Sequence, residues 1–148
     1  MTQPLRILVV EDDPDTLAAV ATLLRDEDGF AVWVARSGEQ ALEVAGELGH
    51  DADVVVVDLH LGAGMRGDQF VAAYRRRTEK PFRLVVLSGV PAAYEIARRI
   101  RASAVIGKPY QADELIRTIR ILARRIQSGR GRLSHAAVTE AEAPAGSR

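Results

Sequence analysis

The chain contains no cysteine and no long hydrophobic run, and each absence excludes a class of protein. Without cysteine, the protein has neither a disulfide framework nor a thiolate metal site. No apolar stretch approaches the roughly 20 residues that a membrane-spanning helix needs. The first apolar stretch leads directly into acidic residues, which is not the pattern of a signal peptide. We therefore expect a cytoplasmic protein that has no membrane partner.

An excess of charge of one sign is also absent, because the formal net charge is zero. This balance conceals two unlike halves. Residues 1–74 hold 4 Lys and Arg against 14 Asp and Glu, whereas residues 75–148 hold 16 against 6. An acidic half can gather a cation site, and a basic half can meet an acidic partner. The simpler interpretation is that folding mixes the two halves.

The 148 residues are enough for one domain with a single core. Five short apolar runs, each followed by a helical pattern, divide the first 127 residues. The runs are residues 5–10, 30–35, 53–58, 83–88 and 104–107. The helical patterns lie within residues 12–29, 37–49, 68–77, 91–102 and 111–127. This alternation predicts an α/β fold with a parallel five-stranded sheet that is covered on both faces.

The last segment, residues 128–148, has a different composition. It is rich in Ala, Gly, Ser and charged residues and has no aromatic residue. Such a segment buries too little apolar surface to order itself. We therefore expect one domain over residues 1–127 and a disordered C-terminal tail over residues 128–148.

Two of the helical patterns begin with recognisable capping residues. Asp13 is suited to cap the first helix, because Pro14 follows it at the first helical position. Ser37 and Gln40 have the spacing of a capping box at the start of the second helix.

Polar residues follow the apolar runs at the places where the strands should end. They are Glu11, Asp12 and Asp13 after the first run, Asp58 at the end of the third, Ser88 at the end of the fourth and Lys108 after the fifth. In a parallel sheet all these strand ends lie along one edge, where open α/β sheets bind ligands. Residues that are remote in sequence should therefore converge on one site.

The chemistry of this set indicates phosphoryl transfer. Neighbouring carboxylates repel one another unless a cation lies between them, and oxygen ligands favour Mg²⁺, Mn²⁺ or Ca²⁺. Lys108 can balance the charge of a phosphoryl group, and the Ser88 hydroxyl can donate to one of its oxygens. Asp58 then suits a covalent acceptor, because carboxylates serve as nucleophiles. Each residue alone has an ordinary alternative as a helix cap, turn residue or loop residue.

Four motifs occur in the order and spacing of a known family. They are ILVVEDDPD (7–15), VVVVDLHL (54–61), VVLSG (85–89) and VIGKPY (105–110). With these motifs the chain resembles the receiver domain of response regulators in two-component signalling, over about residues 5–127. The resemblance implies a flavodoxin-like, doubly wound (βα)5 fold with strand order 2-1-3-4-5. It also implies a single-domain response regulator.

The resemblance implies the following roles at the acceptor site. Asp58 takes a phosphoryl group from a histidine kinase or a histidine phosphotransfer protein. Asp12 and Asp13 hold Mg²⁺, with Mn²⁺ as a substitute, directly or through water. Asp58 and the backbone carbonyl of His60 complete the protein's share of the metal shell. Glu11 has a supporting position just outside it.

The resemblance also assigns the phosphoryl-binding side, where one position departs from the family. Ser88 follows the phosphoryl group, Lys108 contacts it, and the bond between Lys108 and Pro109 is expected to be cis. The family usually carries an aromatic switch residue three positions before the lysine, where this chain has Val105. Tyr110 follows the lysine and is interpreted as a packing residue rather than a replacement switch.

The loop after Asp58 is the second departure from the family pattern. Many members have proline four residues after the acceptor, where this chain has Gly62. Gly64 and Gly67 follow, and the loop is one residue longer than usual. In the family, the side chain two residues after the acceptor, here His60, tends to influence how long the phosphoryl group lasts. The alternative interpretation of His60 is a solvent-facing loop residue.

Basic residues gather in the last third of the chain. Residues 91–132 carry ten Lys and Arg but only three acids. We predict a candidate output face on the helix within 91–102, the strand 104–107 and the helix 111–127, with Arg98, Arg117, Arg120 and Arg124 as its basic residues. The face would bind an acidic protein target or a second copy of the chain, and the alternative is a solvated arginine surface. Direct nucleic-acid binding is not expected, because no aromatic residues interleave with the arginines.

Three classes of function remain to be separated. The first is a phosphorylation-dependent signalling module. The second is a receiver-like adapter that binds its partner regardless of phosphorylation, which the departure at Val105 allows. The third is an aspartate-nucleophile phosphatase, but such enzymes usually need an acid two residues after the nucleophile, where this chain has His60. We therefore expect no enzyme beyond self-phosphorylation and self-dephosphorylation at Asp58.

Overall fold

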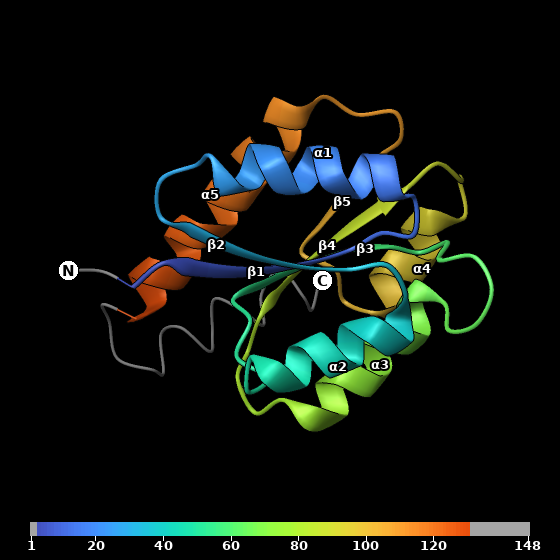
Figure 1. Cartoon of the computed structure of the whole chain (residues 1–148), viewed down its shortest axis with the longest axis horizontal. Helices are drawn as coiled ribbons and strands as arrows, with labels where there is room; N and C mark the ends of the chain where they lie inside the picture. The colour runs from blue at the N-terminus through green and yellow to red at the C-terminus, as the bar shows by residue number, and fades with distance from the viewer. Residues whose placement is uncertain (1–2, 131–148) are drawn as a thin grey trace.

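The computed structural model describes residues 3–130, and a parallel five-stranded sheet forms its centre (Figure 1). The strands are β1 (Leu5–Val10), β2 (Phe30–Ala35), β3 (Val54–Asp58), β4 (Arg83–Ser88) and β5 (Ala104–Gly107). The helices are α1 (Pro14–Arg25), α2 (Gly38–Glu47), α3 (Gly67–Arg77), α4 (Ala93–Arg99) and α5 (Ala112–Arg130). The strand order is β2-β1-β3-β4-β5, which confirms the predicted flavodoxin-like topology.

The helices cover the two faces of the sheet in two separate layers. In Figure 1, α1 lies above the sheet, α5 runs from behind α1 down past the left end of the sheet, and α2 and α3 lie below the sheet. One apolar core fills the space under α1 and α5, and a second core packs α2, α3 and α4 against the opposite face. This division explains why the strands are apolar at nearly every position, since both of their faces are buried.

The central strand β3 is the most deeply buried element. Each of its four valines, residues 54–57, has an exposed fraction of 0%. It pairs with β1 on one side and β4 on the other, with Val57 opposite Val10 and Asp58 opposite Leu87. These registers bring the carboxyl ends of the three strands to the same edge of the sheet.

The predicted caps start α1 and α2. The Asp13 carboxylate accepts from the Thr16 amide at 2.9 Å, and the Ser37 hydroxyl accepts from the Gln40 amide at 3.0 Å. The Gln40 side chain completes the start of α2 by accepting from the Arg36 amide at 2.6 Å. The Thr16 and Gln40 amides are ones that their helices leave without a partner. The Arg36 amide lies before the cap residue, so Gln40 does not accept from the Ser37 amide as the predicted capping box would have it.

Two helix boundaries differ from those predicted. The helix α4 is shorter at both ends than residues 91–102, because a turn precedes it and Arg101 adopts a left-handed conformation (φ 57°) after it. The helix α5 continues to Arg130, three residues past the predicted end. A single glycine at position 129 costs a helix only about 1 kcal/mol and does not end it. The rest of the predicted tail, residues 131–148, lies outside the described residues.

None of the helices within residues 3–130 combines the length and the apolar character needed to cross a membrane.

Candidate functional site

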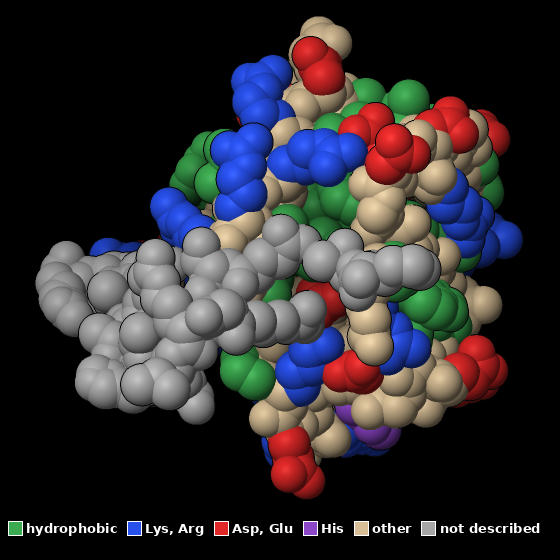
Figure 2. Space-filling view, turned by 90° about the vertical axis from the view of Figure 1, so that its left-hand side faces the viewer, with side chains coloured by type: hydrophobic (Ala, Val, Ile, Leu, Met, Phe, Trp, Pro, Cys, Tyr) green, Lys and Arg blue, Asp and Glu red, His purple; other side chains and the backbone are tan. Residues whose placement is uncertain are grey.

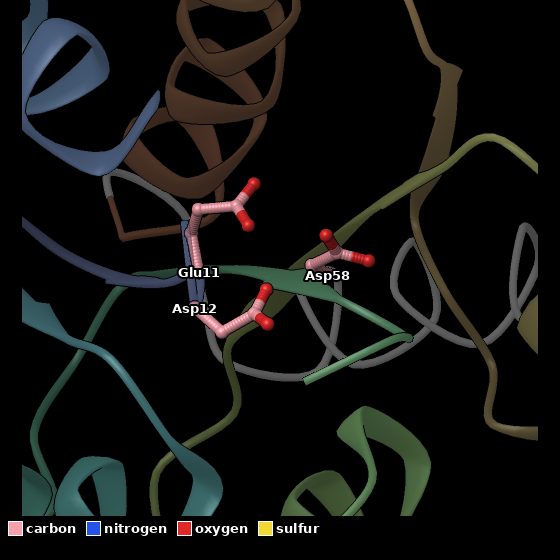
Figure 3. A group of neighbouring side chains, drawn as sticks. All are labelled: Glu11, Asp12 and Asp58. Atoms are coloured by element: carbon pink, nitrogen blue, oxygen red, sulfur yellow. The ribbon is translucent and has the colours of Figure 1, made fainter. Parts of the chain in front are cut away.

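Three carboxylates meet at the edge of the sheet where β1 and β3 end. Glu11 and Asp12 directly follow β1, and Asp58 is the last residue of β3. Their side chains extend into a common space, and one oxygen of each lies within 4.8 Å of the others (Figure 3). Glu11 and Asp58 are buried, whereas Asp12 is half-buried. So close a group of acids is unfavourable without a cation between them.

Lys108 supplies part of the positive charge that these acids require. Its ammonium donates to Asp58 Oδ2 at 2.6 Å and to Glu11 Oε1 at 2.8 Å. Burial lowers the pKa of Lys108, but the hydrogen bonds to Asp58 and Glu11 outweigh this and hold the pKa above its usual value. Burial has the opposite effect on Glu11, whose pKa is raised despite the bond from Lys108.

The donor set fits a divalent cation. Three carboxylates against one ammonium leave two negative charges at the site, and all the side-chain ligands are oxygens. Hard cations such as Mg²⁺ and Mn²⁺ prefer ligands of this kind, and Mg²⁺ commonly takes only one or two carboxylates while keeping water or phosphate oxygens. The described residues contain no other group of three or more potential ligands as close together.

Asp13, predicted to hold Mg²⁺ directly or through water, lies outside the acidic cluster. Its carboxylate caps α1 and accepts from both the amide and the hydroxyl of Thr16. Both bonds, the side-chain bond above all, lower the pKa of Asp13. Glu11, predicted only as a supporting residue, takes the place in the acidic cluster that the sequence analysis gave to Asp13.

The remaining predicted residues surround the acceptor carboxylate. The His60 amide donates to Asp58 Oδ1 at 2.9 Å, so His60 and Lys108 hold the two oxygens of Asp58 from different sides. The His60 side chain is exposed, and the role of its carbonyl as a ligand stays a prediction. Ser88 is buried, and its hydroxyl accepts from the Val90 amide at 3.2 Å. The peptide bond before Pro109 is cis, as predicted.

A family model describes this arrangement directly. Residues 7–120 match the model of the response regulator receiver domain. The chain belongs to this family. The match begins within β1, ends within α5 and contains all the motifs on which the resemblance depended, so the receiver prediction is confirmed.

Curated relatives of this receiver are regulatory proteins. The sensory transduction protein RegX3 of Mycobacterium tuberculosis is 34% identical over 119 residues, which cover 80% of this chain and 51% of RegX3. The DNA-binding response regulator MtrA of Mycolicibacterium smegmatis is 33% identical over 122 residues, covering 81% and 51% respectively. The chain therefore spans about half the length of these relatives.

Solved structures show the same receiver fold. The N-terminal domain of a response regulator/sensory box/GGDEF 3-domain protein from Carboxydothermus hydrogenoformans is 28% identical, with a TM-score of 0.71, covering 84% of this chain and 98% of that one. The chemotaxis response regulator CheY4 of Vibrio cholerae is 25% identical, also with a TM-score of 0.71, covering 82% and 99%.

Val105, which stands where the family usually has an aromatic switch residue, and Tyr110 lie on opposite faces of the sheet. Val105 is half-buried and packs with the core beneath α2, α3 and α4. Tyr110 packs with the core beneath α1 and α5. Its hydroxyl is buried with no hydrogen-bond partner among the described residues, and burial raises its pKa. Tyr110 therefore does not stand in the place of the missing aromatic, in keeping with its interpretation as a packing residue.

The sequence analysis missed two contacts that shape the loop after Asp58. The Glu39 carboxylate, on α2, accepts from the Met65 amide at 3.0 Å. Gly67 is buried at the start of α3, and a Cβ atom there would lie 2.4 Å from the Asp58 carbonyl oxygen. The position of Gly67 directly before a helical pattern could have indicated a close backbone approach there. No local pattern indicates the contact of Glu39 with Met65.

The predicted output face is only partly an open arginine surface. Arg98 pairs with Glu95 at 2.7 Å and Arg117 with Asp113 at 3.7 Å within their own helices, and Arg124 is exposed. Arg120 differs, because it pairs with Glu27 at 2.5 Å and lies over the Phe30 ring. It joins α5 to the region between α1 and β2 and is not free to bind a partner.

Basic and acidic side chains gather on different parts of one face of the molecule (Figure 2). Figure 2 shows the end of the molecule at which the strands begin, and Lys and Arg side chains gather on its upper left while Asp and Glu are frequent on its upper right.

A prediction distinguishes Glu11 from Asp13 as the third carboxylate that holds the metal beside Asp12 and Asp58. Glu11→Gln is expected to weaken Mg²⁺ binding at least tenfold, because it removes one charged oxygen ligand from a small set. Isothermal titration with MgCl₂ measures the affinity, and MnCl₂ gives a second reading. Asp13→Asn is the matched control and should change the affinity less than twofold. The reverse order of the two effects would restore Asp13 as the ligand.

Proposed function

We propose that this receiver accepts a phosphoryl group on Asp58 in a Mg²⁺-dependent reaction and signals by contact with another protein. The observation that carries the proposal is the position of Asp58, buried at the end of β3 between Lys108 and the carboxylates of Glu11 and Asp12. The donor is a histidine kinase or a histidine phosphotransfer protein, and the reaction takes place in the cytoplasm. As the Asp58 oxygen bonds to phosphorus, the phosphorus–nitrogen bond of the donor breaks.

Each residue of the site has a distinct part in this reaction. The fully buried valines of β3 fix the acceptor in place, and positioning supplies much of the catalysis in phosphoryl transfer. Glu11, Asp12 and Asp58 would hold Mg²⁺ (or Mn²⁺), which neutralises charge on the phosphoryl oxygens when bound. Lys108 balances the remaining charge. The Ser88 hydroxyl accepts from an amide, so its own proton is available for a phosphoryl oxygen.

Phosphorylation by a small donor tests the proposal. Incubation with acetyl phosphate and Mg²⁺ is expected to add the mass of one phosphoryl group, measured by intact-protein mass spectrometry. Asp58→Asn should abolish the adduct, because the amide is not a nucleophile of comparable strength. Asp68→Asn, which changes an aspartate at the start of α3, is the matched control and should keep it. Failure of the wild-type protein to form an adduct would count against the proposal.

The output surface in this proposal is the face formed by α4, β5 and α5. Tyr94 on α4 is 63% exposed, one turn before Arg98, and the two form an apolar and basic pair on one helix face. We propose that this face binds an acidic protein target, or a second copy of the chain, when Asp58 is phosphorylated. A receiver-like adapter would instead bind its partner equally well as Asp58→Asn and without Mg²⁺.

A further inference from the structure

A basic hollow lies at the end of the sheet opposite the acceptor site. It is formed by the segment between α3 and β4, the end of α4 and the residues before β5, and its volume is about 580 Å³. Five basic side chains and one acidic side chain contribute to its lining: Arg75, Lys80, Arg83, Arg99, Arg101 and Glu79. Because β4 runs from Arg83 to Ser88, roughly 17 Å of strand separate the hollow from the edge that holds Asp58.

Much of the positive charge in this hollow is not compensated by the protein. Lys80 is neutralised, because its ammonium lies 2.8 Å from Asp51 and 2.8 Å from Asp53. Arg75, Arg99 and Arg101 form no ion pair within the part of the chain that the structure describes. By contrast, Arg98, on the same helix as Arg99, pairs with Glu95 outside the hollow.

Arg75 is held rigidly in this hollow. Its guanidinium donates to the backbone carbonyls of Ile100 and Arg101 and lies 5.5 Å from the centre of the Phe82 ring. These contacts use two of its five N–H donors and leave the others available. Burial lowers the pKa of Arg75, and the neighbouring charge of Arg101 lowers it further. Arg101, whose carbonyl accepts from Arg75, has a left-handed backbone conformation.

We propose that this hollow is a second binding site, which takes a small ligand bearing a diphosphate or triphosphate group through Arg75, Arg99 and Arg101. Guanidinium groups match phosphate oxygens in charge and in forked geometry. The volume suits a ligand between pyrophosphate and a nucleotide in size. The basic residues gather at one hollow and do not form the extended basic track that a nucleic acid needs, which favours a small ligand.

Titration of the full chain with sodium pyrophosphate and with ATP, both without divalent cations, tests this proposal. Arg99→Gln and Arg101→Asn are expected each to weaken binding about tenfold, since each removes charged hydrogen bonds to phosphate. Asparagine is chosen because it tolerates the left-handed conformation at position 101. Arg98→Gln is the matched control and should stay within twofold of the wild type. Circular dichroism verifies that each variant folds.

The outcomes separate the sources of the phosphate group. Equal affinity for the two probes identifies the phosphates as the whole determinant, and tighter ATP binding adds contacts to the nucleoside; both support the proposal. Amide chemical shifts should change near Phe82 and Ser103 rather than near Asp58. The proposal is overturned if neither probe binds, if Arg98→Gln weakens binding as much as the other variants, or if only RNA or DNA binds.

Discussion

Gly67→Ala is expected to destabilise the protein by about 3 kcal/mol, the upper end for an overpacked interior site. An added Cβ would lie 2.4 Å from the Asp58 carbonyl oxygen and 2.8 Å from Leu59 Cα. Both are backbone atoms, so no side-chain rotation relieves the clash. Either the end of β3, which carries Asp58, or the start of α3 must move.

Gly46→Ala is the matched control for this substitution. Gly46 is exposed on α2, and an added Cβ meets nothing within 4 Å. Alanine there should stabilise the protein by about 0.5 to 1 kcal/mol, because it restricts the unfolded chain and favours a helix. Urea unfolding measures both variants. Equal stability of the two would show that the chain at Gly67 relaxes without cost.

The same clash has a consequence for function. Displacement of the Asp58 backbone would move the acceptor away from Lys108, whose ammonium now lies 2.6 Å from it. Gly67→Ala should therefore also slow phosphorylation by acetyl phosphate, whereas Gly46→Ala should not.

The fold was largely predictable because its signals are local. Each apolar run lies next to a helical pattern, and two of these patterns begin at a capping residue, Asp13 or Ser37. The valines at 54–57 and the acid after them indicated a buried strand that ends in a functional residue. The structure confirms that strand and buries all four valines completely.

The choice among the three consecutive acids after β1 was not predictable in the same way. A shift of one residue along a strand sends a side chain to the other face of the sheet. The Glu11 amide still donates to the Ala35 carbonyl at 3.0 Å, so Glu11 continues the ladder beyond the last assigned strand residue. Asp13 is thereby left to begin the helix. The sequence predicted the cap at Asp13, and a carboxylate that caps the helix is not free to join the acidic cluster, which leaves Glu11 and Asp12.

Contacts between segments far apart in the sequence were not predictable, because no local pattern indicates them. Glu39 and Met65 are 26 positions apart, and Arg120 and Glu27 are 93 apart. The sequence assigned Arg120 to the candidate output face but gave no information about which residue it contacts. Only the packing of α5 beside α1 brings the carboxylate within reach.

Lys108→Met is expected to cost about 3 kcal/mol of stability at neutral pH, because it leaves buried carboxylates without their partner. Glu11 and Asp58 would face each other with side-chain exposed fractions of only 2% and 7%. Addition of Mg²⁺ should recover part of the loss, since the cation replaces the missing positive charge among the same oxygens. Urea unfolding with and without MgCl₂ measures both effects.

Lys80→Met provides a closely matched control for the recovery by Mg²⁺. Lys80 is 27% exposed against 29% for Lys108, and it also bridges two carboxylates, those of Asp51 and Asp53. Among residues 3–130, no third carboxylate joins the pair at Lys80 within metal-binding range, whereas Glu11 and Asp58 are joined by Asp12. Loss of stability in both variants, with recovery by Mg²⁺ in Lys108→Met alone, therefore assigns the cation to the acceptor site. Equal recovery in both would instead indicate a general effect of the salt.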